Sequence, residues 1–248
     1  MKFYLNYNIW NKESHIDILL RCIKYFIPPT VIIDFTFEDL KDSSLINFNN
    51  SNNTQKYLIN HQYTATETSL KYRMKNINAA IERFLKTDCD VFIAPQDDQF
   101  IQDSRLLDNI RNLYSQENNI GLVGMRDGFE YGYKNYFSSN FSISIPSYNT
   151  TWLKSGDYKC VDIVNDGPLV LHRKTIEKVG LFDAENFNVF YIEDDYCLRC
   201  KKLGLRNFVL GGEILHMKFG SVLRSELYYP HLNFAAIDRS VLRRKHNV

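Results

Sequence analysis

The chain has 248 residues, of which 44% are apolar and 24% charged, and its formal net charge is +1. This composition is typical of a globular protein with one large core, and the length is short for two domains. The near-neutral charge gives no strong field for a polyanion, so we expect no nucleic-acid partner.

No apolar run approaches the ~20 residues of a membrane-spanning helix, and the first residues lack the apolar core of a signal peptide. We therefore expect a cytoplasmic protein. The five cysteines are scattered and odd in number, which argues against a disulfide framework. Cys197 and Cys200 form a CxxC inside a predicted helix, and without a second pair we expect buried free thiols rather than zinc ligands.

Strand and helix patterns alternate through the first half of the chain. The predicted strands are residues 2–9, 30–35, 90–95 and 120–125, and the predicted helices are 15–27, 69–86 and a third that carries Leu106, Leu107, Ile110 and Leu113. Asp103 is predicted to be the N-cap of that third helix, and the polar residues 41–63 are predicted to be a loop. The order predicts an α/β domain with a mostly parallel central sheet and helices on both faces.

The pattern loosens over residues 126–160, which show no clear period. The later predicted elements are a strand at 167–172, helices at 173–179 and 194–203 that end at Gly180 and Gly204, strands at 205–210 and 213–216, and a tail helix at 231–244. We find no internal repeat and no linker, so a single domain is expected.

Two adjacent acids, Asp97 and Asp98, follow the apolar strand at 90–95. In an open α/β sheet, ligands bind at the carboxyl ends of strands. Adjacent carboxylates there can hold Mg²⁺ or Mn²⁺, which prefer oxygen ligands and neutralise the charge that develops on a leaving diphosphate. Solvated charges or a helix cap are the alternative interpretation.

A second acidic cluster, Glu193-Asp194-Asp195, opens the helix predicted at 194–203. Acids at a helix start are favoured by the macrodipole, so a cap is one interpretation. The other is a general base that accepts a proton from an attacking hydroxyl. His216 closes a later strand, and it is either a Mn²⁺ ligand or an ordinary hydrogen-bonded histidine.

Taken together, these segments resemble the family 2 glycosyltransferases, which have the nucleotide-sugar GT-A fold. Residues 166–174 (DGPLVLHRK) resemble the family's strand that begins with glycine and ends in basic residues, and 179–183 (VGLFD) match its turn. The acidic cluster, Leu198-Arg199 and a His shortly before a Ser follow in the family's order.

The resemblance implies an inverting, hexosyltransferase-like enzyme that uses a UDP-, GDP- or dTDP-sugar, a glycan or lipid-linked acceptor, and Mn²⁺ or Mg²⁺. It implies a metal site at Asp98 with Asp97 and His216, although Gln96 replaces the family's usual first Asp. The substrate-binding residues that we predict are Asn8, Asp34, Lys75, Asn76, Asp97, Gly167 and, on the acceptor side, Trp152.

Two residues can be matched to the catalytic base of the family's acidic motif. Anchoring on Arg199 selects Glu193, whereas anchoring on the Glu-Asp pair selects Asp194, which we narrowly favour; Asp195 is the third acid of this predicted catalytic cluster. The resemblance covers residues 1–222, with a nucleotide-binding part at 1–125 and an acceptor-binding part at 126–222. Residues 223–248 lie outside it and are predicted to be a C-terminal helical tail.

Two other functions fit parts of the sequence. One is a catalytically silent nucleotide- or glycan-binding protein of the same fold. The other is a nucleotidyltransferase, which normally carries a glycine-rich phosphate loop that is not visible here. The basic residues at 239–246 form either a solvated tail or a peripheral contact with anionic lipid.

Overall fold

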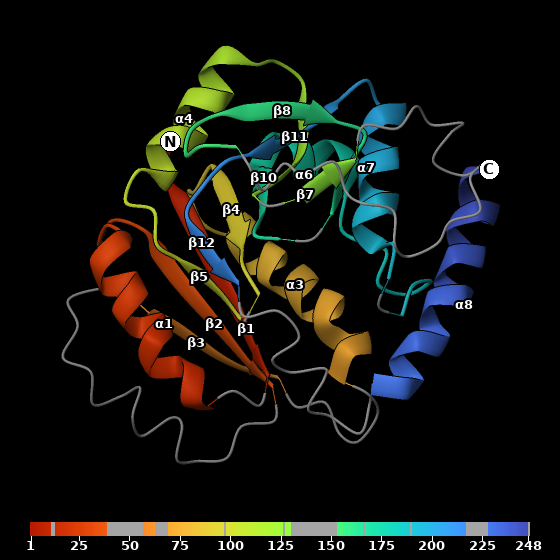
Figure 1. The fold of residues 1–248 in the computed structure, drawn as a ribbon, viewed down its shortest axis with the longest axis horizontal. Helices are drawn as coiled ribbons and strands as arrows, with labels where there is room; N and C mark the ends of the chain where they lie inside the picture. The colour runs from red at the N-terminus through yellow and green to blue at the C-terminus, as the bar shows by residue number, and fades with distance from the viewer. Residues whose placement is uncertain are drawn as a thin grey trace.

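The computed structural model describes residues 1–10, 13–38, 57–62, 69–96, 98–125, 127–129, 153–165, 167–188, 190–216 and 228–247. Their elements, in chain order, are β1 (Phe3–Trp10), α1 (Glu13–Phe26), β2 (Ile32–Glu38), β3 (Tyr57–Gln62), α3 (Ser69–Leu85), β4 (Val91–Ala94), β5 (Gln99–Ile101), α4 (Leu106–Gln116), β6 (Ile120–Gly124), β7 (Asp127–Phe129), β8 (Tyr158–Val161), β9 (Ile163–Asn165), β10 (Leu169–His172), α6 (Arg173–Val179), α7 (Ile192–Lys202), β11 (Arg206–Leu210), β12 (Ile214–His216) and α8 (Tyr228–His246) (Figure 1).

Within these ranges, eight strands form one sheet in the order β3-β2-β1-β4-β10-β6-β11-β8. Strands β3, β2, β1 and β4 pair in parallel, and so do β6 and β11. Strand β10 runs antiparallel to both β4 and β6, and β8 runs antiparallel to β11. The prediction of a mostly parallel central sheet is therefore confirmed.

The two faces of the sheet carry separate apolar cores. Alternate residues of β1 point to opposite faces, so that Leu5 and Tyr7 pack with α1 and α4, while Tyr4 packs with α3, α6 and α7. Helices on both faces were predicted, and the structure confirms them. Each fully buried large side chain contributes roughly 1.5–3 kcal/mol to this core.

Two local predictions are wrong. The segment predicted to be a loop contains β3, which pairs in parallel with β2 at the edge of the sheet. The strand forms because β2 supplies backbone hydrogen-bond partners, which cannot be recognised from the sequence of the segment alone. Asp103 is not the N-cap of α4, a position that Arg105 occupies. Its buried carboxylate instead accepts hydrogen bonds from the Arg105 amide at 2.9 Å and from the Ser155 hydroxyl.

The predictions for two glycines and two cysteines are confirmed. Gly180 and Gly204 follow α6 and α7 with φ angles of 88° and 73°, a backbone conformation that favours glycine. Cys197 and Cys200 are buried and free, and burial raises the pKa of both thiols, that of Cys200 to about 12. None of the helices in the described ranges is long and apolar enough to cross a membrane.

Candidate active site

The predicted metal site lies where β4 turns into β5. Asp98 is in this turn, and its side chain is buried. Strand β5 pairs with β12 in an antiparallel ladder that places the backbone of His216 opposite Gln99, the residue next to Asp98. Strand pairing therefore brings together two predicted metal ligands that lie more than a hundred residues apart in the sequence.

Asp97 and the His216 side chain lie outside what the structure describes. Among the side chains that it does describe, no group of three or more His, Cys, Asp or Glu residues is placed to hold a metal ion. The one predicted ligand whose side chain is described, the buried Asp98 carboxylate, offers the kind of oxygen ligand that Mn²⁺ and Mg²⁺ prefer.

Gly167 is hydrogen-bonded to the same edge of the sheet. The Gln99 side chain donates to the carbonyl oxygen of Gly167 at 2.7 Å and accepts from the Gln96 amide at 2.9 Å. A Cβ atom at Gly167 would lie 3.0 Å from the Leu169 nitrogen and 3.2 Å from the Ala94 oxygen, so the close approach of these chains requires a glycine.

Asp34, a predicted nucleotide contact, is fully buried in β2. One of its carboxylate oxygens accepts from the Tyr4 hydroxyl at 2.7 Å, from the Asn6 amide at 3.1 Å and from the Arg83 guanidinium at 2.8 Å. These bonds tie β1, β2 and α3 together. In this conformation the carboxylate stabilises the packing of these elements, and its contact with a nucleotide stays a prediction.

The other predicted substrate-binding residues lie on several elements. Asn8 is half-buried in β1 beside Thr36 of β2. On α3, Lys75 forms an ion pair with Glu185 at 3.0 Å, and Asn76 is buried. Trp152 lies outside the described residues, as do Tyr131, Tyr133 and Tyr136. No substrate contact is tested by this geometry.

The acidic cluster forms the first turn of α7. Tyr191 precedes it in a left-handed conformation, with φ 60° and ψ 13°, which is uncommon for a residue other than glycine. The Asp195 amide donates to the Tyr191 carbonyl at 2.9 Å and closes this turn. Glu193 and Asp195 are buried, and Asp194 is partly exposed.

Asp194 has the electrostatic character of a base. Burial raises its pKa to about 7, and the negative charge of Asp195 adds to the shift. A carboxylate whose pKa lies near neutrality can be ionised at working pH and still take up a proton effectively.

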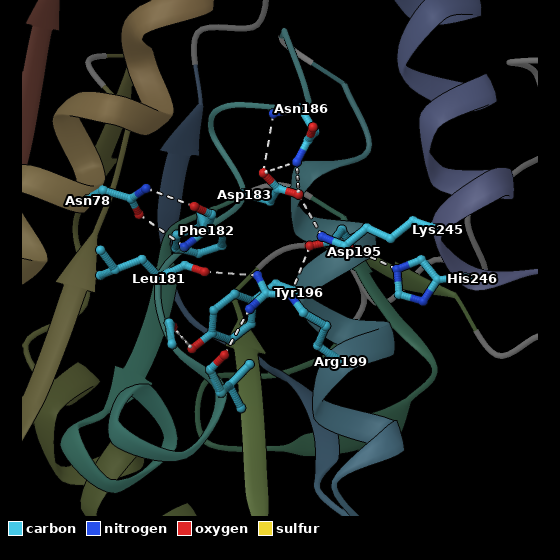
Figure 2. Close-up of polar contacts among 12 residues, drawn as sticks. Asn78, Leu181, Phe182, Asp183, Asn186, Asp195, Tyr196, Arg199, Lys245 and His246 are labelled. Carbon is cyan, nitrogen blue, oxygen red and sulfur yellow. Dashed lines mark hydrogen bonds and ion pairs between the residues drawn. The ribbon is translucent and has the colours of Figure 1, made fainter.

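Asp195 has the opposite character. Burial alone would raise its pKa, but hydrogen bonds from His246 and Lys245 and the charge of Arg199 outweigh burial and lower the pKa to about 2. The carboxylate accepts from Arg199 Nε at 2.9 Å and meets Lys245 Nζ and His246 Nε2 at 2.8 Å each (Figure 2). Such a carboxylate is a weak base, so Asp195 is suited to structure rather than to proton transfer.

Arg199 also fixes the predicted turn at 179–183. Its guanidinium donates to the carbonyl oxygens of Val179 and Leu181 at 2.9 Å each. On the α3 side, Asn78 exchanges two hydrogen bonds with the backbone of Phe182, at 2.8 and 3.0 Å (Figure 2). The turn, α3 and α7 therefore hold one another in place.

Strand β9 links helix α7 to the β4–β5 edge. Strand β9 packs against α7, and the Val164 amide donates to the Cys197 sulfur at 3.3 Å. From Asn165, the last residue of β9, to Gly167, which is bonded to Gln99, the backbone can span at most about 7 Å. Strand β9, which packs against α7, therefore ends only two residues before Gly167 at the β4–β5 edge.

Three residues of α8 that the sequence did not predict to lie beside the acidic cluster are Asp238, Lys245 and His246. Asp238, Leu242 and His246 are spaced four residues apart and are all buried, so they share one face of the helix. That spacing of an acid and a histidine around a buried leucine was the available signal. Of the basic residues for which a solvated tail was one interpretation, His246 is buried against Asp195, whereas Lys245 is exposed and also pairs with Asp195.

Comparisons by sequence give no relative. No protein-family model matches the chain, and no curated protein matches it.

Comparison with solved structures gives many matches of low sequence identity. The mannosyltransferase PcManGT from Pyrobaculum calidifontis, in complex with GDP-Man and Mn²⁺, matches with a TM-score of 0.55 and 10% identity over 85% of this chain and 55% of that chain. TarS from S. aureus in complex with UDP matches with a TM-score of 0.55 and 14% identity, over 85% and 57% of the two chains.

A third match is GalNAc-T7 with UDP, GalNAc and Mn²⁺, with a TM-score of 0.55 and 8% identity over 86% and 44% of the two chains. The chain has the GT-A fold. It spans about half of the length of these glycosyltransferases. At identities this low the likeness establishes the GT-A fold and leaves substrates to be inferred from the site.

Proposed function

We propose that this GT-A protein is a metal-dependent, inverting glycosyltransferase of the family 2 type. It would transfer a sugar from a nucleoside diphosphate-sugar to a hydroxyl group of a glycan or lipid-linked acceptor. The observation that carries the proposal is the first turn of α7, where burial raises the pKa of Asp194 to about 7. Strand β9 packs against this helix and ends two residues before Gly167, which is bonded to Gln99 beside Asp98. The GT-A neighbours solved with GDP-Man or UDP, two of them with Mn²⁺, support the same donor class.

The β4–β5 edge is the proposed donor site. Asp98, Asp97 and His216 would hold Mn²⁺ or Mg²⁺, which when bound neutralises the charge that develops on the leaving diphosphate. The buried Asp98 carboxylate and the pairing of His216 with Gln99 support this assignment. Asn8, Asp34, Lys75, Asn76 and Gly167 remain proposed donor contacts, and Trp152 a proposed acceptor contact.

Asp194 is the proposed general base. It would accept the proton of the acceptor hydroxyl while that oxygen bonds to the anomeric carbon and the bond from this carbon to the diphosphate breaks. A single base with no covalent nucleophile favours inversion. Glu193 is the alternative base. Asp195 is a poor candidate because it pairs with Arg199, Lys245 and His246, which hold its pKa at about 2.

We also propose a cytoplasmic location. A peripheral contact with anionic lipid could involve only the basic side chains of α8 that face solvent, such as Arg243 and Arg244, since His246 is buried in the contact with α7.

The test is a donor screen on the full chain. UDP-, GDP- and dTDP-sugars are added with Mn²⁺, and both the thermal shift and the slow release of nucleoside diphosphate are measured. We expect one nucleotide class to raise the melting temperature, because a ligand that binds only the folded state stabilises it, and the same donor to be hydrolysed slowly. A shift without release would identify a silent binding protein, and no shift with any donor would overturn the proposal.

A further inference from the structure

The C-terminal helix α8 packs against the acidic turn through a buried polar face. Asp238 and Leu242 have no exposed surface, and His246 is 5% exposed. Because a buried carboxylate and a buried imidazole cost free energy unless they are hydrogen-bonded, their partners indicate what the helix is holding.

Asp238 holds the chain that leads into α7. Its carboxylate accepts from the Asn188 amide nitrogen at 3.0 Å, from the Asn188 side chain at 2.7 Å and from the Phe190 amide nitrogen at 2.9 Å. Phe190 is the residue before Tyr191, whose left-handed backbone begins the helix. Asp238 therefore anchors the backbone immediately upstream of the acidic turn.

Lys245 and His246 hold the turn itself. Lys245 Nζ lies 2.8 Å from one oxygen of Asp195 and 2.6 Å from Asp183, and its ammonium group lies 5.7 Å from the centre of the Phe187 ring. His246 Nε2 lies 2.8 Å from the same oxygen of Asp195. In Figure 2 both side chains reach from α8 toward the first turn of α7.

These contacts reach Asp183, Asn188 and Phe190 before Tyr191 and Asp195 after it. Asp195 is the next residue after Asp194, so a rotation of the Asp195 side chain and backbone would also turn Asp194. The donor, in contrast, is expected at the β4–β5 edge. A loss of these contacts should therefore disturb the base more than it disturbs donor binding.

We propose that Asp238, Lys245 and His246, together called the C-terminal clasp, are positioning residues that orient the first turn of α7 so that Asp194 faces the acceptor hydroxyl. This inference rests on the proposed function. The clasp acts through Asp195, Asn188 and the backbone of Phe190, and it is not itself expected to touch substrate.

The test compares Lys245→Met with Lys245→Arg in the full chain. Methionine keeps an apolar stem against Phe187 but removes the charge, whereas arginine keeps a cation that can reach Asp195. Arg244→Met, at an exposed neighbouring position, is the matched control. His246→Gln, which keeps a side-chain donor, is the second variant in case Lys245→Met unfolds.

Three quantities are measured for each variant: kcat and KM for release of nucleoside diphosphate from UDP-glucose and GDP-mannose with Mn²⁺, the affinity for UDP and GDP with Mn²⁺, and amide hydrogen exchange over residues 190–195. For Lys245→Met we expect kcat to fall at least about 10-fold and exchange over 190–195 to quicken by a similar factor, because misplacing a catalytic group is costly. KM and nucleotide affinity should stay within about twofold of wild type, since the donor site is elsewhere. Lys245→Arg should recover most of kcat.

The clasp is overturned if Lys245→Met keeps wild-type kcat, or if its loss of kcat is matched by an equal loss of nucleotide affinity and is not recovered by arginine. If the wild-type chain releases nucleoside diphosphate from neither donor and from no other in the screen, the proposed function fails instead. The clasp is then judged by exchange alone: faster exchange confined to 190–195 supports it, and unchanged exchange overturns it.

Discussion

The β4–β5 edge and the first turn of α7 both present acidic residues, but different forces hold them. At the edge, strand pairing and the close approach of Gly167 place Asp98, so that backbone hydrogen bonds do most of the positioning. At the turn, ion pairs and hydrogen bonds from α8 place Asp195. The first site depends on the sheet, whereas the second depends on a few side chains more than forty residues away.

Two adjacent aspartates within the turn show how strongly surroundings decide chemistry. Burial raises the pKa of Asp194 to about 7, whereas Lys245, His246 and Arg199 hold that of Asp195 at about 2 despite its burial. Successive helical residues point about 100° apart, so only one of the two carboxylates faces the basic side chains. One acid is thereby made a candidate base and the other an anchor.

The largest expected effect is on turnover when Asp194 is replaced. Asp194→Asn should lower kcat by about 10²–10⁴-fold, the usual contribution of a general base, and should leave nucleotide affinity unchanged. Steady-state release of nucleoside diphosphate and calorimetric binding of UDP or GDP with Mn²⁺ measure the two quantities. The profile of kcat/KM should rise with pH up to about 7, because the base must be deprotonated.

Glu193→Gln is the matched control for that substitution. If the glutamine variant loses turnover while Asp194→Asn keeps it, the base is Glu193 and the alignment anchored on Arg199 is the correct one.

The next largest effect is on stability when the anchor is replaced. Asp195→Asn should lower the free energy of unfolding by about 3 kcal/mol at pH 7, because the fully buried carboxylate is the counter-charge of Arg199 and Lys245 and the hydrogen-bond partner of His246. The folded-state pKa of about 2 lies below the ordinary 3.8, so this carboxylate stabilises the fold fully above about pH 4. The gap between variant and wild type should therefore shrink as pH falls from 4 toward 2, as urea unfolding would show.

Asp162→Asn is a control for this substitution, because Asp162 pairs with Lys201 of the same helix at a partly exposed site. We expect a loss of less than about 1 kcal/mol there. Equal losses at the two positions would mean that burial of the Asp195 pairs carries no special weight.

The smallest effect is on the pH dependence of the free energy of unfolding when Asp194 is replaced. Its folded-state pKa of about 7 exceeds the ordinary 3.8, so the folded protein binds the proton more tightly and this carboxyl destabilises the fold as pH rises from about 4 to 7. Asp194→Asn removes that cost. The two pKa values correspond to about 4 kcal/mol between pH 4 and pH 8. Because solvent screens the partly exposed carboxylate, we expect the variant to gain roughly half of this, about 2 kcal/mol, relative to wild type, measured by urea unfolding at both pH values. A constant difference between the two pH values would contradict the raised pKa.

The same contrast explains what the sequence could predict. The spacing of apolar residues within each segment predicts strands β4 and β6 and helices α1 and α3. Because ligands bind at the carboxyl ends of strands, the strand before Asp97-Asp98 also marks these acids as candidate ligands. The assignment of His216 to the same metal site as Asp98 came from the family resemblance rather than from spacing. The pairing of β12 with β5, which places the His216 backbone opposite Gln99, was not predicted.

What could not be predicted depends on contacts between segments far apart in the chain. Strand β3 lies at the end of a segment rich in Asn and Ser, and its short apolar start, Tyr57-Leu58-Ile59, becomes a strand by pairing with β2. The buried role of Asp103 depends on Ser155, and that of Asp195 on Lys245 and His246. No local pattern links such residues, because their proximity arises from the packing of whole elements.

The most direct test of the account is nucleotide binding by two aspartate variants. Binding of UDP and GDP is measured with and without Mn²⁺ for wild type, Asp98→Asn and Asp194→Asn. The account predicts that wild type and Asp194→Asn bind one nucleotide in a Mn²⁺-dependent manner, that Asp98→Asn loses this dependence, and that neither variant turns over the donor. Mn²⁺-dependent binding and full turnover by Asp98→Asn would contradict it.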